Sequence, residues 1–122
     1  LQLAERYQSK LLFSPSLVMP RIALGGKAVF MNFPIQLPDG DRAYNLIGRG
    51  RREEGIYLEN WPAKKVIGPR GTDLQKLQYQ NNSCPVAERV APKVVVLPTN
   101  PNTRLEDAER VIQFIKHYLS DD

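Results

Sequence analysis

The sequence is poor in the residues that most often carry chemistry. Its 122 residues include one cysteine, Cys84, and one histidine, His117. A single cysteine excludes an internal disulfide, which suits a reducing compartment, and we expect a cytoplasmic protein. One cysteine and one histidine also argue against a zinc site. The two could pair as nucleophile and base, but no motif surrounds Cys84, and a structural cysteine with a surface histidine is the simpler interpretation.

The sequence also lacks a long apolar run. No stretch approaches the roughly 18 to 20 apolar residues that a membrane-spanning helix needs, so we expect no membrane segment. The first residues, LQLAERYQSKLL, carry charge and do not form the apolar centre of a signal peptide. Apolar residues make up 42% and charged residues 25% of the chain, which is typical of a globular domain with its own core.

Positive charge is in slight excess and is partly concentrated. The net charge is +4, and GRGRR at residues 48–52 holds three arginines. Such a cluster could contact phosphate or nucleic acid. No aromatic interleaving or nucleic-acid-binding pattern accompanies it. A solvated helix face is therefore the first interpretation, a phosphate contact by Arg51 and Arg52 is the second, and nucleic acid is not expected.

The C-terminal stretch gives the clearest structural prediction. Residues 94–97, VVVL, form a continuous apolar run that is typical of a buried strand, and Pro98 ends it. Thr103 and Glu106 have the spacing of a capping box, which predicts a helix over residues 103–119. Apolar residues recur through that range at helical spacing, so one face of the helix is expected to be buried.

Periodicity and turn residues predict the other elements. They are a helix over 1–13, a loop over 14–26, a strand over 27–37, a helix over 41–54 capped by Asp41 and stopped by Gly55, a strand over 56–60, a long loop over 63–83 with a short helix near 74–79, and a short helix over 85–90 begun by Ser83 or Cys84. Pro34 predicts an edge or a bulge in its strand. The expected fold is α/β (α+β), a small three-stranded sheet covered by helices, in a single domain over residues 1–122.

Three segments carry a resemblance to a known family: CPVAER at 84–89, VVVLPTNPNT at 94–103 and LEDAERVIQFI at 105–115. Their order and spacing resemble the C-terminal end of the DegT/DnrJ/StrS aminotransferases. NFPI at residues 32–35 is similar to the strand that opens the family's small domain. The resemblance implies the C-terminal small domain of a fold-type I pyridoxal phosphate (PLP) transferase, with residues 1–26 as connecting helix and loop and residues 27–122 as the small domain.

Members of this family are PLP enzymes that mostly aminate sugar nucleotides. Their Schiff-base lysine and its partner carboxylate lie in the large domain. The resemblance therefore implies that these 122 residues bind no cofactor and hold no catalytic residue alone, and that a PLP-binding large domain or subunit is the missing partner. The faces of helix 1–13 and strand 28–37 that meet the large domain in the family would be apolar and exposed, which would also favour a homo-oligomer.

The resemblance also places candidate substrate contacts at Asn60, Trp61, Arg51 and Arg52. A family segment that lines the mouth of the active site reads His-Tyr-Pro, and here Asn60, Trp61 and a proline stand in its place. Both family histidines of this region are absent. Trp61 could stack on a substrate ring or pack at the rim of the core, and the two arginines could meet a substrate phosphate.

Three functions remain open at this stage. The first is the small domain of an aminotransferase in sugar-nucleotide or cell-surface polysaccharide biosynthesis, inactive alone. The second is a stand-alone, non-catalytic binding or interaction module with the same fold. The third is a basic nucleic-acid binder, whose affinity would fall steeply with added salt.

Overall fold

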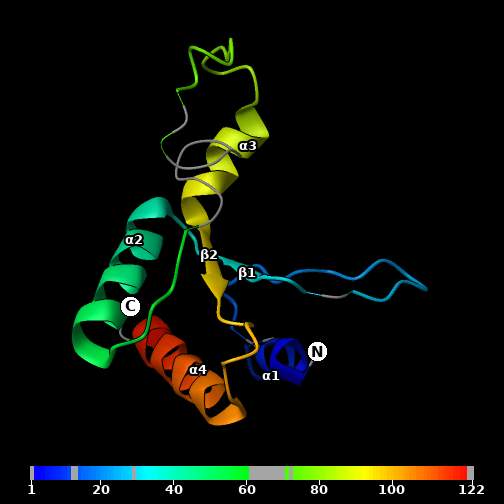
Figure 1. Cartoon of the computed structure of the whole chain (residues 1–122), viewed down its shortest axis with the longest axis vertical. Helices are drawn as coiled ribbons and strands as arrows, with labels where there is room; N and C mark the ends of the chain where they lie inside the picture. The colour runs from blue at the N-terminus through cyan, green and yellow to red at the C-terminus, as the bar shows by residue number, and fades with distance from the viewer. Residues whose placement is uncertain (1, 12–13, 29, 61–70, 72, 121–122) are drawn as a thin grey trace.

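The computed structural model describes residues 2–11, 14–28, 30–60, 71 and 73–120 of the chain. The elements are α1 (Gln2–Leu11), β1 (Phe33–Gln36), α2 (Gly40–Arg49), a π-helical turn η1 (Gly50–Glu54), α3 (Pro85–Val90), a 3-10 turn η2 (Ala91–Lys93), β2 (Val94–Leu97) and α4 (Leu105–Ser120). Figure 1 shows α1, α2 and α4 gathered at one end of the molecule, with α3 extending away from them.

The sheet is two-stranded, so the prediction of three strands is wrong in part. β1 and β2 pair antiparallel, with Phe33 opposite Leu97 and Gln36 opposite Val94. Two single bridges extend this pair, one on each side: one joins residues 18 and 36, and the other joins residues 59 and 96. The strand expected over 27–37 is confirmed only at its C-terminal end, because β1 spans residues 33–36.

Residues 56–60 keep the alternation of a strand but add only one bridge. Ile56 and Leu58 are buried and Tyr57 is exposed, as the sequence pattern predicts. The Val96 N–H donates to the Glu59 carbonyl over 2.7 Å. The next acceptor along β2, the Val94 carbonyl, receives its hydrogen bond from the side chain of Asn60. Within the described residues, the side chain of Asn60 thus adds to the contact between this segment and β2.

The edge position predicted for Pro34 is confirmed. The Leu37 N–H donates to the Lys93 carbonyl over 2.9 Å, so the odd-numbered residues of this strand direct their N–H groups toward β2. Gln36 instead exchanges hydrogen bonds of 3.0 Å with Val18, on the other side. Pro34, like Gln36, is an even-numbered residue whose backbone nitrogen faces away from β2. Its lack of an N–H therefore removes no hydrogen bond to β2.

One face of the sheet and three helices form the core. The buried side chains of the sheet face are Phe33, Ile35, Leu37, Val95 and Leu97, and they belong to the same cluster as buried residues of α1, α2 and α4. Two long-range hydrogen bonds tie the helices to this core. The Tyr7 hydroxyl of α1 donates to the Pro98 carbonyl over 2.8 Å, and the Tyr118 hydroxyl of α4 donates to the Arg42 carbonyl over 3.0 Å.

The second helix begins two residues earlier than predicted. Asp39, not Asp41, is the N-cap, and its carboxylate accepts from the Arg42 N–H over 2.8 Å. Leu46 of this helix is fully buried, whereas Tyr44 is 67% exposed. The turn η1 continues the helix to residue 54. Gly55 then ends it with φ +65°, which confirms the predicted stop.

Two other local predictions need correction. α4 begins at Leu105, and the capping carboxylate belongs to Asp107, which accepts from the Arg104 N–H over 2.9 Å; the expected pair was Thr103 and Glu106. Residues 74–78 form turns, not a short helix. The helix over 85–90 is confirmed, with Cys84 at its N-cap position and no hydrogen bond from the cysteine side chain to the helix end.

Candidate functional site

The first predicted contact residue, Asn60, lies inside the molecule. It is 8% exposed, and its Nδ2 donates to the carbonyls of Ala91 and Val94, each over 2.8 Å. These bonds join residues 56–60 to η2 and β2. Sequence reasoning missed this role, because the two carbonyls come from a segment more than thirty residues further along the chain.

Arg51 and Arg52 lie on η1, at the surface, and both are exposed. The guanidinium of Arg51 lies over the ring of Tyr57, 5.6 Å from its centroid. The side chain of Arg52 folds back over Gly48, where an added Cβ would come within 2.9 Å of Nη1. The π-helical turn thus presents two guanidinium groups at the protein surface, where an anionic group could reach them.

Two further arginines surround the same turn: Arg49, which belongs to the predicted arginine cluster, and Arg110, which the sequence analysis did not single out. Arg49 lies 5.3 Å from the ring centroid of Tyr118 and 3.4 Å from the carboxylate of Glu53. Arg110 of α4 donates to the Glu54 carbonyl over 2.8 Å. Both hold η1 in place, and so they fix the segment from which Arg51 and Arg52 project. Only the fold brings Arg110 to this turn, because 56 residues separate it from residue 54.

A polar groove of about 390 Å³ adjoins this turn along α4. Its lining residues are Glu54, Glu109, Arg110, Gln113, Phe114 and His117. The groove mixes carboxylates, a guanidinium and an imidazole, so it suits a polar ligand. His117 opens onto this groove at the end of α4, whereas Cys84 precedes α3. Figure 1 shows these two ends well apart, which separates the two halves of the cysteine–histidine pair considered above.

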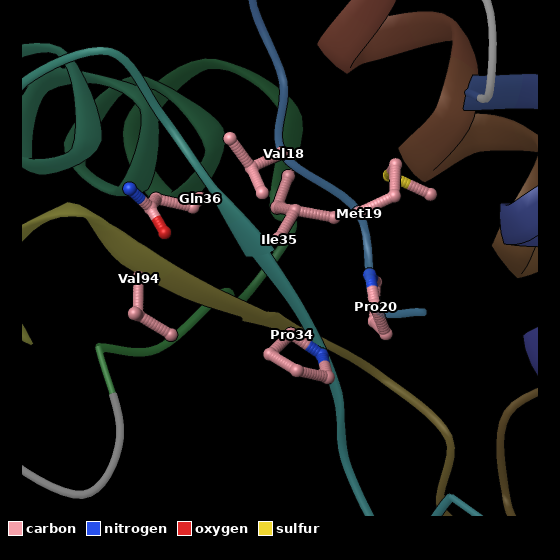
Figure 2. Close-up of a pocket in the computed structure, with 7 residues that line it drawn as sticks. All are labelled: Val18, Met19, Pro20, Pro34, Ile35, Gln36 and Val94. Atoms are coloured by element: carbon pink, nitrogen blue, oxygen red, sulfur yellow. The ribbon is translucent and has the colours of Figure 1, made fainter. Parts of the chain in front are cut away.

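A second pocket, of about 220 Å³, lies at the open edge of β1 (Figure 2). Val18, Met19 and Pro20 line it from one side, and Pro34, Ile35, Gln36 and Val94 line it from the sheet. Its only polar side chain is that of Gln36. The pocket can therefore hold an apolar group but carries no charged residue that could serve a reaction.

Trp61 lies outside the described residues, so its surroundings are not part of this account. Asn60 is the last described residue before it. Asn60 itself lies beside η2 and the start of β2.

The described lysines lie at the surface. A Schiff-base lysine needs a desolvated pocket, but the described lysines are all exposed or half-exposed: Lys10, Lys27, Lys76, Lys93 and Lys116. Within the same described ranges, no group of three or more His, Cys, Asp or Glu side chains is placed to hold a metal ion. Nor does any helix there combine the length and apolar character that crossing a bilayer requires.

The fold and the site therefore define a small α+β domain with an arginine-bearing turn at its surface. Residues 1–116 match the model of the DegT/DnrJ/EryC1/StrS aminotransferase family. This match covers nearly the whole chain, and the chain belongs to that family. No curated protein sequence is similar enough to count as a match.

Three solved structures illustrate the similarity in fold. NtdA from Bacillus subtilis, with bound cofactor PMP, is 20% identical to this chain, with a TM-score of 0.74. The matched region includes 98% of this chain and 27% of NtdA. The aminotransferase TlmJ from Streptoalloteichus hindustanus is 22% identical, with a TM-score of 0.75, and the matched region includes 98% of this chain and 31% of TlmJ. DesV from S. venezuelae, in complex with a ketimine intermediate, is 23% identical, with a TM-score of 0.75, and the matched region includes 97% of this chain and 30% of DesV.

The chain thus spans less than a third of the length of these structures. That extent is consistent with the small C-terminal domain which the sequence resemblance implies. The larger part of each relative has no counterpart among these 122 residues.

Proposed function

We propose that the chain is the C-terminal small domain of a DegT-type aminotransferase that aminates a sugar nucleotide, as in the synthesis of cell-surface polysaccharides. Residues 1–26 then connect to the large domain and residues 27–122 are the small domain. The assembled enzyme is a cytoplasmic homo-oligomer. The main support is the family match over residues 1–116 in a chain that spans only 27% to 31% of its solved relatives.

On this proposal the chain alone binds no cofactor and catalyses nothing. Five of its seven lysines are described, and none of these is buried. The lysine that holds PLP and the carboxylate beside the cofactor ring would come from the large domain. The small domain contributes surface, shape and substrate contacts instead.

The proposed substrate contacts are Arg51, Arg52, Trp61 and the region around Asn60. Both arginines are exposed on a turn that Arg49 and Arg110 hold in place, which suits recognition of a phosphate group. Asn60 is engaged with two backbone carbonyls. Its part would be to fix the point from which the chain continues to Trp61, whose ring would stack on the substrate.

The test joins the chain to a cofactor-bearing large domain. Three proteins are compared: the chain alone, the large domain of TlmJ alone, and that domain with this chain in place of its matched third. Each is mixed with PLP, an amino acid as amino donor and a panel of nucleotide-linked keto sugars. We expect amino transfer only from the joined protein. No transfer from a joined protein that is folded and loaded with cofactor would count against the proposal.

A stand-alone binding module is the alternative function. It is favoured by the closed core, in which buried residues of three helices and the sheet form one cluster without any further domain. On this alternative the chain is soluble and stable by itself, and joining a large domain adds no activity. Nucleic-acid binding finds less support, because Arg49 and Arg110 contact groups of the protein itself.

A further inference from the structure

Tyr57 is an aromatic side chain that the fold places outside the core. Its neighbours Ile56 and Leu58 are buried, and they fix the backbone on either side of it. Tyr57 itself is 68% exposed, because alternate side chains of an extended segment point to opposite sides. Tyrosine is enriched at contact surfaces, where its ring offers apolar area and its hydroxyl stays in water.

The guanidinium of Arg51 lies over the ring of Tyr57, 5.6 Å from its centroid. Arg51 projects from η1, and hydrogen bonds hold this turn at both ends. The Ile56 N–H donates to the carbonyl of residue 50 over 2.9 Å, and Arg110 of α4 donates to the carbonyl of residue 54 over 2.8 Å. Figure 1 shows the chain reversing at the end of α2 and running from there toward β2. The arginine and the ring therefore have a defined relative position.

The stack leaves the hydrogen-bonding groups of Arg51 available. A guanidinium stacks through its flat face, while its five N–H donors lie in the plane and point outward. Phosphate oxygens can therefore reach these donors without breaking the contact with Tyr57. Because most of Tyr57 stays exposed beside the stack, a second planar ring can pack against it. The pair offers anion donors and an aromatic surface side by side.

The turn η1 also keeps two guanidinium groups without an ion pair. Arg49 is paired with Glu53 at 3.4 Å. In the part of the chain that the structure describes, neither Arg51 nor Arg52 forms an ion pair with a carboxylate. The remaining carboxylate of the turn, that of Glu54, lines the groove along α4. Two such guanidinium groups beside an exposed ring suit an anion that also carries a planar group.

We propose that Tyr57, Arg51 and Arg52 form a binding site for the nucleoside diphosphate part of a nucleotide sugar. The base stacks on Tyr57, and the two arginines bind the phosphates. The identity of the ligand rests on the proposed function, to which Tyr57 adds a base-stacking residue. Stacking on an aromatic side chain requires a planar ring and tolerates different bases. The site therefore recognises the nucleotide and leaves the sugar to other contacts.

This surface suits a short anion better than a nucleic acid strand. Glu59 is exposed two residues beyond Tyr57, on the same side of the extended segment. Its carboxylate would repel a phosphate chain that continued in that direction. A strand needs a basic groove with several stacking rings along it. One nucleoside diphosphate carries one base and two phosphates, which match one ring and two guanidinium groups.

The site is tested on the 122-residue chain itself, with uridine diphosphate (UDP) and pyrophosphate as probes. Affinities are measured by calorimetric titration, and saturation-transfer NMR reports contact with the uracil ring. We expect Tyr57→Leu to lower the affinity for UDP about tenfold, because the stack with the base is lost. The affinity for pyrophosphate, which has no base, should change less than about twofold. Saturation transfer to the ring protons of uracil should be lost in the same variant.

Three further variants separate the ring from its surroundings. Tyr57→Phe keeps the ring and should keep the affinity for UDP. Arg51→Ala should weaken UDP and pyrophosphate alike, by about tenfold, because both ligands use its donors. Val86→Ala, which shortens an exposed apolar side chain on α3, should leave both affinities unchanged. The melting temperature of each variant checks that the fold is kept.

The opposite results overturn the inference. They are an absence of UDP binding by the chain, an unchanged affinity for UDP in Tyr57→Leu, or equal losses for UDP and pyrophosphate in that variant. A single-stranded oligonucleotide that binds more tightly than UDP, with a steep dependence on salt, identifies nucleic acid as the ligand and also overturns it.

The joined protein separates this inference from the proposed function. Amino transfer with a KM for the nucleotide sugar that Tyr57→Leu leaves unchanged refutes the nucleotide site, and the function stands. Binding of UDP through Tyr57 in a folded, cofactor-loaded joined protein that transfers nothing supports the nucleotide site and counts against the function.

Discussion

The side-chain amide of Asn60 donates to the carbonyl of Val94 at the start of β2 over 2.8 Å. The same nitrogen donates to the carbonyl of Ala91. One buried side chain therefore joins three segments: the stretch before residue 61, the turn η2 and the strand β2. Stability at this point depends on a single amide group.

Replacing Asn60 by alanine should destabilise the chain. The carbonyls of Ala91 and Val94 then lose this donor. A buried polar group left without a hydrogen bond costs about 1–3 kcal/mol. We expect Asn60→Ala to lower the free energy of unfolding in urea by that amount. The control is Asn81→Ala, at an exposed position, which should change it by less than about 0.5 kcal/mol. Equal effects of the two substitutions would contradict the role given to Asn60.

Gly50 is required by close packing, whereas Gly48 is not. A Cβ on Gly50 would lie 3.0 Å from the ring of Phe114 and 3.2 Å from the Ile56 carbonyl, two groups that the core holds in place. Gly50→Ala should cost about 1–3 kcal/mol from overpacking. In Gly48→Ala the new methyl group meets only the mobile end of Arg52, so the higher helix propensity of alanine should make it neutral or stabilising by up to about 1 kcal/mol. The melting temperature should therefore fall in Gly50→Ala and stay unchanged or rise in Gly48→Ala. Similar losses in both would refute this account.

The buried hydroxyl of Tyr7 makes the stability of the fold sensitive to pH in the alkaline range. Burial first, and the charge of Asp107 second, raise the pKa of Tyr7 well above its usual value. The folded chain then keeps a proton that the unfolded chain loses above a pH of about 10, so the free energy of unfolding falls as pH rises beyond that point, by at most about 1.4 kcal/mol per pH unit. Tyr7→Phe should flatten this fall, at a cost of about 1 kcal/mol at neutral pH for the lost bond to Pro98. An unchanged alkaline slope in the variant would rule out Tyr7 as its source.

Arg51 and Arg52 should affect substrate binding without affecting the fold. Both side chains are exposed, so Arg51→Ala and Arg52→Ala should leave the melting temperature of the isolated chain nearly unchanged. In the joined enzyme each should raise KM for a nucleotide sugar by about tenfold, the loss of one charge-assisted hydrogen bond of roughly 1.5 kcal/mol. Arg89→Ala, at an exposed position of α3, is the matched control. A KM that is unchanged in both η1 variants would remove these arginines from the site.

The elements that the sequence predicts best are those whose local signals agree. In β2 and α4 an apolar run, proline stops, helical spacing and an acidic first turn all point to the same structure, and both elements form within two residues of the expected bounds. The family assignment drew on the same stretch, and it is confirmed by the match over residues 1–116.

The elements that were predicted poorly depend on long-range contacts. Residues 27–32 were predicted as part of a strand, but β1 begins only at residue 33. Of the predicted strand over 56–60, the described residues form one bridge, between residues 59 and 96, and the side chain of Asn60 supplies a further bond to β2. The N-cap of α2 was misplaced by two residues because Asp39 and Asp41 are equally good caps by composition.

The candidate site was predictable only in part. The sequence does show a cluster of arginines, but it does not show that residues 50–54 form a π-helical turn which Arg110 of α4 supports. The buried position of Asn60 depends on carbonyls that only the fold brings near it. The polar groove along α4 likewise combines residue 54 with residues of a helix that begins some fifty positions later.

The central claim, that the chemistry lies outside these 122 residues, is tested most directly by locating the lysine that holds the cofactor. The joined protein is loaded with PLP, reduced with borohydride to fix the cofactor covalently, digested and mapped by mass spectrometry. The account predicts one modified lysine, in the large domain, and no specific modification of the chain alone. Stoichiometric modification of any one of the seven lysines of this chain would contradict it.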